Sequence, residues 1–254
     1  MNSDTMKAVR ELLEGGEQAK IPYEEINARF EGVNASIYGE GMVKWCPDYH
    51  YAHDLLLRSI KPTLPASAKI LDLGAGTGRV SKLLLEAFET CHVTLLDLSP
   101  NMLKEAPNKL RDFAGRYTIV QGDFFNQEVD FPAQSFDAVV SVFSICHGRK
   151  QKNYQDLYKK IYKSLKPGTR FVCIDYVYSP TIDLSELAFH DWGDFMTPHF
   201  PPESVYEALT STITEDSPLT LQTHMQLLLD AGFSAVDVLW RKSIFGMYMG
   251  IKQA

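Results

Sequence analysis

The chain has 254 residues, which is enough for one large α/β domain or for one domain with a cap. Hydrophobic residues make up 45% and charged residues 22% of the chain, as in ordinary soluble globular proteins. The net charge of -7 excludes a surface that as a whole neutralises a phosphate backbone, so a nucleic-acid partner is not expected.

The four cysteines stand at positions 46, 91, 146 and 173, where they form no C-x-x-C pair and match no zinc-site spacing. The first residues show no basic stretch followed by an apolar core, and no apolar run is long enough to span a bilayer. We therefore expect a reduced, cytoplasmic protein with neither a membrane anchor nor a metal site.

Residues 1–48 predict helical pieces, over Lys7–Leu13 and Pro22–Phe30, separated by polar residues and glycines. No core strand is expected in this part of the chain. It is predicted to form either a lid or the contact arm of a homodimer.

From Tyr49 onward helices and strands alternate. An amphipathic helix over Tyr49–Ile60 comes first, and Ser99 is the expected N-cap of a later helix that begins at Pro100. Strands are predicted at 68–73, 92–97, 117–121, 136–142 and 169–177, and further helices at 77–88 and 153–165. Such alternation predicts βαβ units and a parallel sheet with helices on both faces.

The last part of the chain breaks this alternation. Runs 235–240 and 243–251, joined by Arg241 and Lys242, predict a tight antiparallel hairpin at the edge of the sheet. Helices are predicted at 183–194, 202–212 and 220–231. The third helix is expected in the core, and the first two in a cap insertion, about 178–218, over the carboxyl edge of the sheet.

A glycine turn over residues 72–78 follows the first predicted strand. A dinucleotide site needs G-x-G-x-x-G or G-x-G-x-x-A, but the third position holds Arg79 when counted from Gly74 and Ser81 when counted from Gly76. Both glycines still let the backbone approach a ligand without a Cβ in the way. The N-terminus of the following helix can bind a carboxylate.

This turn resembles the first motif of the class I S-adenosylmethionine-dependent methyltransferases, apolar-Asp/Glu-apolar-Gly-x-Gly-x-Gly. Other segments agree in the same order over about 49–251, namely Asp97 after the second strand, Gln121-Gly122-Asp123-Phe124 after the third, 135–140 and 165–169. The resemblance implies an α/β, Rossmann-like fold over 49–254. That fold is a seven-stranded, mostly parallel sheet with an antiparallel terminal hairpin, helices on both faces and a helical cap.

The resemblance also implies the cofactor, S-adenosyl-L-methionine, with S-adenosyl-L-homocysteine as its product. In the family, the acid after the second strand binds both ribose hydroxyls, and the acid after the third binds the adenine amino group. Carboxylates suit a ligand with a sulfonium and hydrogen-bond donors better than they suit a pyrophosphate. The expected cofactor-binding residues are Tyr49, Asp72, Gly74, Ala75, Gly76, Asp97, Leu98, Met102, Asp123, Phe124 and Val142.

Residues 45–49 resemble the Pro-x-Tyr segment of the wobble-uridine carboxy-S-adenosylmethionine synthases and related small-molecule methyltransferases, in which the tyrosine reaches the methionine end of the cofactor. The synthase reaction needs a cation that binds a second carboxylate, and Arg241 is the candidate. The alternative is that Arg241 is a solvated arginine in the hairpin turn. Methyl transfer to a small molecule is therefore the first hypothesis. A carboxy-S-adenosylmethionine synthase for tRNA modification and a non-catalytic cofactor-binding protein are the alternatives.

Methyl transfer relies on alignment of the reacting atoms, and it needs a general base only where the acceptor must lose a proton. His147, after the fourth strand, and His190, in the cap, are the candidate bases, with packed or solvent-facing histidines as the alternative. The candidate substrate contacts are Tyr176, Trp192, His199 and Arg241. The basic helix 151–166 is interpreted as a solvated face, with tRNA contact as the alternative.

Overall fold

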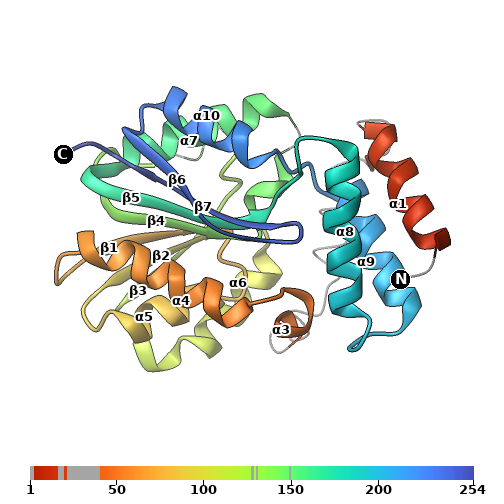
Figure 1. The fold of residues 1–254 in the computed structure, drawn as a ribbon. Coiled ribbons are helices and arrows are strands. Elements are labelled where there is room, and N and C mark those ends of the chain that lie inside the picture. Colours follow the sequence, from red (N-terminus) through yellow and green to blue (C-terminus); the bar gives the residue numbers. More distant parts are fainter. Residues whose placement is uncertain (1–2, 17–19, 22–40, 127–128, 130, 149) are drawn as a thin grey trace.

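The structure is a computed structural model that describes residues 3–16, 20–21, 41–126, 129, 131–148 and 150–254. Its centre is a seven-stranded sheet in the order β3-β2-β1-β4-β5-β7-β6 (Figure 1). The strands are β1 Lys69–Leu73, β2 His92–Asp97, β3 Tyr117–Gln121, β4 Phe136–Val142, β5 Leu165–Tyr176, β6 Ala235–Lys242 and β7 Phe245–Ile251. Strands β1 to β5 pair in parallel, and β7 pairs antiparallel with both β5 and β6. The predicted sheet and its terminal hairpin are confirmed.

Helices cover both faces of the sheet, as Figure 1 shows. One face packs against α4 Tyr49–Ile60, α5 Arg79–Ala87 and α6 Pro100–Lys109, and the other against α7 Gln151–Ser164 and α10 Leu221–Ala231. Neighbouring residues on β1 serve opposite faces, because side chains alternate along a strand: Ile70 joins the first core and Leu71 the second. Ser99 caps α6 as expected, accepting a bond from the Met102 amide. Short 3₁₀ turns are η2 Lys61–Thr63, η3 Arg111–Phe113 and η4 Ile145–His147.

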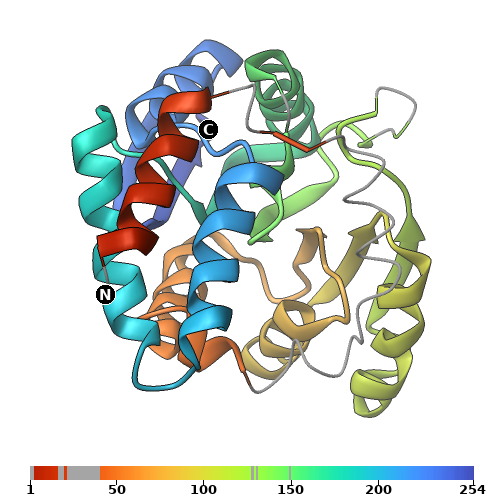
Figure 2. The ribbon, with the colours of Figure 1, turned by 90° about the vertical axis from the view of Figure 1, so that its right-hand side faces the viewer.

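A third core lies beyond the carboxyl ends of the parallel strands. It is built by α1 Ser3–Gly15, α3 Met42–Trp45, α8 Ile182–Met196 and α9 Pro202–Glu215. Figure 2 looks onto this edge and shows α1, α8 and α9 in front of one half of the sheet. Arg10 ties α1 to α8 through Asp183 at 2.9 Å and Glu186 at 2.7 Å. The first helix thus packs against the predicted cap helices α8 and α9. The predicted helix Pro22–Phe30 lies outside the described residues.

Several predicted boundaries differ from the structure by a few residues, and two of these differences involve strand pairing. The hairpin turn does not lie at Arg241 and Lys242, which pair with β7 inside β6; Ser243, at φ +51°, and Ile244 form the turn instead. A register irregularity between Val238 and Trp240 shifts the pairing by one residue, and Arg241 and Lys242 pair with Gly246 and Phe245 beyond it.

The fifth strand begins at Leu165 rather than at 169. Leu165 pairs with Phe136 on β4, and the Lys166 Nζ lies 2.7 Å from the buried Asp137 carboxylate. These two contacts hold the segment before Pro167-Gly168 in the sheet, although proline and glycine predict a break there. Within the described residues, none of the helices is long and apolar enough to cross a bilayer.

One buried histidine makes stability depend on pH. His224 on α10 has its Nδ1 2.6 Å from the Tyr158 hydroxyl, which lies 2.9 Å from the Tyr248 hydroxyl. Burial lowers the pKa of His224 to about 3. The folded protein therefore keeps this ring neutral at pH values where the unfolded chain protonates it.

The neutral ring contributes stability fully above the unfolded pKa of about 6.5, and this contribution is lost as pH falls toward the folded pKa. As pH falls from 6.5 to 4.5, the unfolding free energy measured in urea decreases in both proteins. We expect it to decrease by about 1.4 kcal/mol per pH unit less in His224→Gln than in the wild type. The control is His50→Gln, at an exposed position of α4. A wild-type slope in the His224 variant would contradict the prediction.

Candidate active site

The glycine turn after β1 has one closed side and one open side. Gly74 has φ +71°, and a Cβ there would lie 1.8 Å from the Ser144 Oγ, in the loop after β4. Gly76 has φ +53°, and a Cβ there would meet no atom within 4 Å. The first glycine thus allows the turn to pack on the neighbouring loop, whereas the second leaves the backbone open to a ligand.

Two acids hold this turn in different ways. Asp97, at the end of β2, accepts bonds from the Gly76 amide at 2.7 Å and the Ser99 amide at 2.8 Å. Burial is the main cause that raises its pKa. Asp72 is buried and accepts a 2.6 Å bond from the Ser81 hydroxyl on α5, and burial raises its pKa to about 7. Asp97 therefore lies at the open side of the turn, while Asp72 anchors the following helix from inside.

Two cations lie beside the turn, and sequence reasoning assigned neither of them to the site. The Arg79 guanidinium lies 4.3 Å from the ring centroid of Tyr49, the first residue of α4, and that ring lies 3.9 Å from the His53 ring. The Lys109 Nζ lies 2.5 Å from the Thr77 Oγ1. The feature of the sequence that could have indicated Arg79 is its position directly after the last glycine of the turn, at the start of a helix.

The third predicted acid lies on the neighbouring strand. Asp123 follows β3 and accepts a 2.8 Å bond from the Phe125 amide, and Phe124 beside it is buried. Gly122, before it, donates a 2.9 Å bond to the Asp97 carbonyl. The other predicted cofactor residues lie at the same edge: Ala75 in the turn, Leu98 exposed after β2, Met102 in the first turn of α6 and Val142 at the end of β4.

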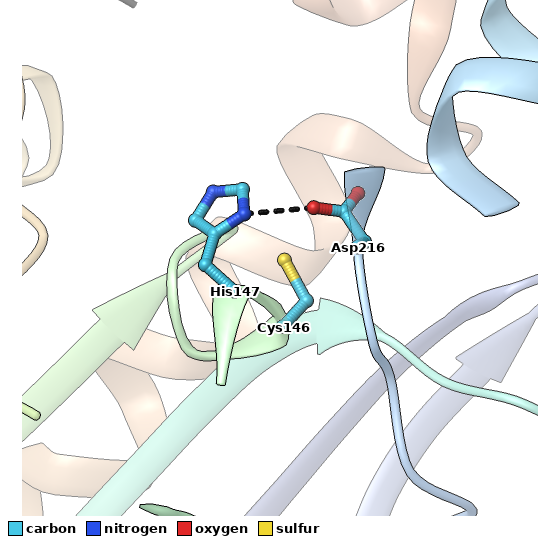
Figure 3. A group of neighbouring side chains, drawn as sticks. All are labelled: Cys146, His147 and Asp216. Atoms are coloured by element: carbon cyan, nitrogen blue, oxygen red, sulfur yellow. Dashed lines mark ion pairs between the residues drawn. The ribbon is translucent and has the colours of Figure 1, made fainter. Parts of the chain in front are cut away.

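A histidine and an aspartate meet beside this edge. His147 lies in η4, after β4, and its Nδ1 is 2.7 Å from the Oδ1 of Asp216, the residue that follows α9 (Figure 3). The Asp216 side chain is 8% exposed and that of His147 is 25% exposed. No motif in the sequence indicates Asp216, because it is a lone acid after a helix.

Cys146 completes a cluster in which one atom of each residue lies within 4.8 Å of the others. A tetrahedral metal ion bonded at about 2.1 Å holds two nitrogen or oxygen ligands about 3.4 Å apart. The 2.7 Å between the His147 Nδ1 and the Asp216 Oδ1 is shorter than this separation and is that of a direct ion pair, whose two atoms are not aligned for a hydrogen bond. We therefore interpret these two residues as an acid–base pair.

The candidate residues of the cap have partners of their own. On α8, the His190 Nδ1 lies 3.1 Å from Asp194, and the buried Trp192 donates its indole N–H to the Trp45 carbonyl at 2.6 Å. His199, after α8, is exposed, and its ring lies 5.8 Å from the Phe195 ring.

The remaining two substrate candidates lie on the sheet. Arg241, on β6, donates to the Ser179 hydroxyl. Tyr176, at the end of β5, stacks on Phe143 with ring centroids 5.6 Å apart. Phe143 belongs to the same loop as His147, so of the four substrate candidates Tyr176 is the one that the chain brings next to the loop of the acid–base pair.

Comparisons with known proteins indicate which proteins this chain resembles. Residues 70–168 match the model of a family described as a methyltransferase domain. The chain is 26% identical over 227 residues to the carboxy-S-adenosyl-L-methionine synthase of Nautilia profundicola, over 88% of this chain and 94% of that protein. It is 29% identical over 187 residues to the demethylmenaquinone methyltransferase of Listeria monocytogenes, over 70% of each.

Solved structures share the fold. Phosphoethanolamine N-methyltransferase 2 of Haemonchus contortus, in complex with S-adenosyl-L-methionine, has a TM-score of 0.66 and 17% identity, over 92% of this chain and 60% of that one. This chain thus spans less than two thirds of that protein. The glycine turn with its open side, Asp97 at the end of β2, Asp123 after β3 and the matched methyltransferase domain agree with one another. The chain thus carries a methyltransferase domain over residues 70–168, and its likeness to the class I S-adenosylmethionine-dependent methyltransferases indicates S-adenosyl-L-methionine as the cofactor.

Proposed function

We propose that this protein transfers a methyl group from S-adenosyl-L-methionine to a hydroxyl group of a small molecule. The observation that carries this proposal is the 2.7 Å contact between the His147 Nδ1 and Asp216. A carboxylate on Nδ1 favours the tautomer in which Nε2 accepts a proton. A hydroxyl acceptor needs such a base, because its oxygen is a weak nucleophile until its proton leaves.

Each of these groups has a separate role in the proposed reaction. The cofactor supplies an electrophilic methyl group on a sulfonium. Asp97 and the open backbone at Gly76 would bind it, and Tyr49 with Arg79 would hold its methionine end. His147 takes the hydroxyl proton on Nε2, and Asp216 stabilises the imidazolium that results. The stacked rings of Tyr176 and Phe143 favour an acceptor that is partly apolar.

The acceptor can be tested directly. We expect the purified protein, given S-adenosyl-L-methionine labelled in its methyl group, to label a member of a panel of phenols and other hydroxylated small molecules. Each phenol is paired with the analogue that lacks the hydroxyl. Label on the analogues, or on amines alone, would contradict a hydroxyl acceptor.

Cofactor binding is tested at Asp97. For Asp97→Ala we expect calorimetry to show affinity for S-adenosyl-L-methionine reduced at least about tenfold, because a charge-assisted hydrogen bond contributes roughly 1.5–3 kcal/mol. Asp112→Ala, an exposed acid in η3, is the control and is expected to bind normally. Unchanged affinity in the Asp97 variant would reject the ribose contact.

A second function, synthesis of carboxy-S-adenosyl-L-methionine, is favoured by the synthase relative, whose similarity extends over 88% of this chain. Against it, Arg241, the expected cation for a second carboxylate, donates to Ser179. Mass spectrometry of the cofactor that co-purifies with the protein separates the two functions. A sulfonium heavier by one carboxyl group would replace methyl transfer with the synthase reaction.

A further inference from the structure

We propose that Tyr154 is a positioning residue that keeps His147 and Asp216 in the correct position relative to each other. This inference rests on the proposed role of that pair. His147 and Asp216 come from different parts of the chain, η4 on the sheet edge and the end of α9 in the cap. Their relative position therefore depends on how two backbone segments are joined.

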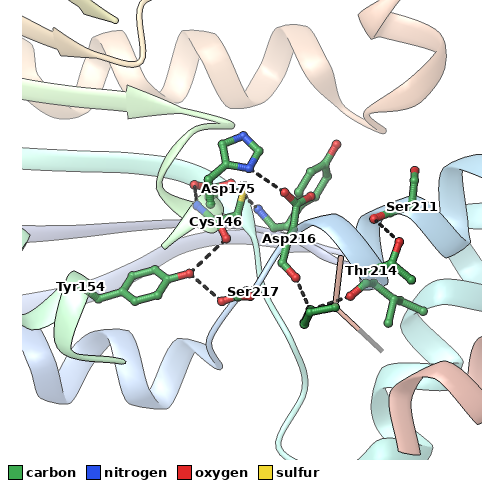
Figure 4. Close-up of polar contacts among 11 residues, drawn as sticks. Cys146, Tyr154, Asp175, Ser211, Thr214, Asp216 and Ser217 are labelled. Atoms are coloured by element: carbon green, nitrogen blue, oxygen red, sulfur yellow. Dashed lines mark hydrogen bonds and ion pairs between the residues drawn. The ribbon is translucent and has the colours of Figure 1, made fainter. Parts of the chain in front are cut away.

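The junction is made one residue away from each partner. The Ser217 amide donates a 2.8 Å bond to the Cys146 carbonyl, so the residue after Asp216 is bonded to the residue before His147. The Tyr154 hydroxyl, on α7, lies 2.6 Å from the Ser217 carbonyl and 3.2 Å from the Cys146 carbonyl (Figure 4). One side chain thus contacts both halves of the junction.

Packing holds this hydroxyl in place. Tyr154 is fully buried, and its ring makes edge contacts with Phe125 at 6.2 Å and His224 at 5.6 Å. A Cβ at Gly148, directly after His147, would lie 2.8 Å from the Tyr154 ring, so the missing side chain lets the ring approach η4. Burial raises the pKa of Tyr154 well above its usual value, which keeps the hydroxyl a donor.

Other contacts anchor the two halves separately. The Asp175 carboxylate, on β5, accepts a 2.9 Å bond from the Cys146 amide and so fixes η4 to the sheet. Lys20 donates to the carbonyls of Ile213 and Asp216 and so holds the end of α9. Tyr154 differs from both because it contacts the two segments at once. Without its hydroxyl each segment keeps its own anchor, but a link between them is lost.

The test is Tyr154→Phe, with Tyr158→Phe as the matched control. Tyr158 lies one turn later on α7 and is equally buried, but its hydroxyl bonds to His224 and Tyr248 rather than to the junction. We expect Tyr154→Phe to lower kcat roughly 10- to 100-fold with KM for the cofactor changed less than about threefold, because a shift of about 1 Å in a catalytic group costs about that much. Tyr158→Phe is expected to keep kcat within about threefold while losing comparable thermal stability.

Two further measurements separate the inference from the function on which it rests. Added to His147→Gln, Tyr154→Phe is expected to lower kcat no further, since it acts through His147. If His147→Gln itself is fully active, both the function and the inference are overturned. If His147→Gln is inactive but the two tyrosine variants have equal kcat, only the inference is overturned.

A second measurement tests the proposal without the Tyr154 variant. If Tyr154→Phe does not fold, hydrogen exchange at the wild-type Ser217 amide replaces it. Slow exchange, at the rate of the core strands, supports a rigid junction, because this amide is bonded to the Cys146 carbonyl. Exchange as fast as in an exposed loop overturns the proposal.

Discussion

His147→Gln is expected to lower kcat roughly 10²- to 10⁴-fold, the range over which a positioned general base contributes. Glutamine keeps a polar side chain at this position but cannot accept the proton. The KM for the cofactor is expected to change less than kcat, since the ring pairs with Asp216. Steady-state kinetics with an acceptor from the phenol panel measures both values.

The pH dependence gives a second readout of the same variant. Without the base, the acceptor must lose its proton to solvent, so the residual rate is expected to rise steadily with pH. The control is His92→Gln, at the opposite, amino end of β2, where the ring bonds to the Thr118 hydroxyl at 2.9 Å. A His147 variant with the kcat of the His92 variant would remove the base from the mechanism.

Asp216→Asn probes the orienting half of the pair. The amide cannot stabilise an imidazolium, so kcat is expected to fall in the same direction as in His147→Gln. Combining the two changes is expected to cost about as much as His147→Gln alone, because the residues act as one unit. Additive losses would mean that Asp216 acts elsewhere.

Gly74→Ala is expected to have the largest effect on stability. Its Cβ would lie 1.8 Å from the Oγ and 2.2 Å from the Cβ of Ser144, at a φ of +71° that alanine rarely adopts. Left-handed strain costs about 1–3 kcal/mol and overpacking about the same again, so we expect a loss of roughly 2–6 kcal/mol. Urea unfolding followed by circular dichroism measures this loss.

Two matched variants separate the clash from the strain. Gly76→Ala has a similar φ of +53° but meets no atom within 4 Å, so it is expected to fold with a smaller loss and to bind the cofactor more weakly. Adding Ser144→Gly to Gly74→Ala removes both clashing atoms and is expected to recover part of the stability. Equal stability of the Gly74 and Gly76 variants, or no recovery, would contradict the close approach of the two loops.

The parts of the fold that could be predicted are those that short stretches of sequence encode. The strands β2, β3 and β4 and the helix α4 have the predicted bounds, because apolar runs and helical spacing end there at polar or breaking residues. The hairpin turn and the start of β5 were misplaced. A register irregularity and the Lys166–Asp137 contact lie near these boundaries, and both depend on pairing with another strand.

The candidate site shows the same division. The glycine turn, Asp97 and Asp123 could be placed together from the sequence alone, since the carboxyl ends of adjacent parallel strands meet at one edge of the sheet. Asp72, by contrast, is buried within β1 and bonds to Ser81. His147 could be proposed for the same reason, but its partner Asp216 could not. The contacts of Trp192 and Arg241, with Trp45 and Ser179, also depend on how the cap and the hairpin pack.

The sequence by itself indicated the cofactor, because the strand, the glycine turn and the strand-end acids resemble the motifs of a family that binds it. Only the tertiary structure decided the acid–base pair. The pair forms because the end of α9 lies next to η4, and the packing of the cap on the sheet edge determines that contact. Contacts between segments so far apart in the chain leave no local pattern to read.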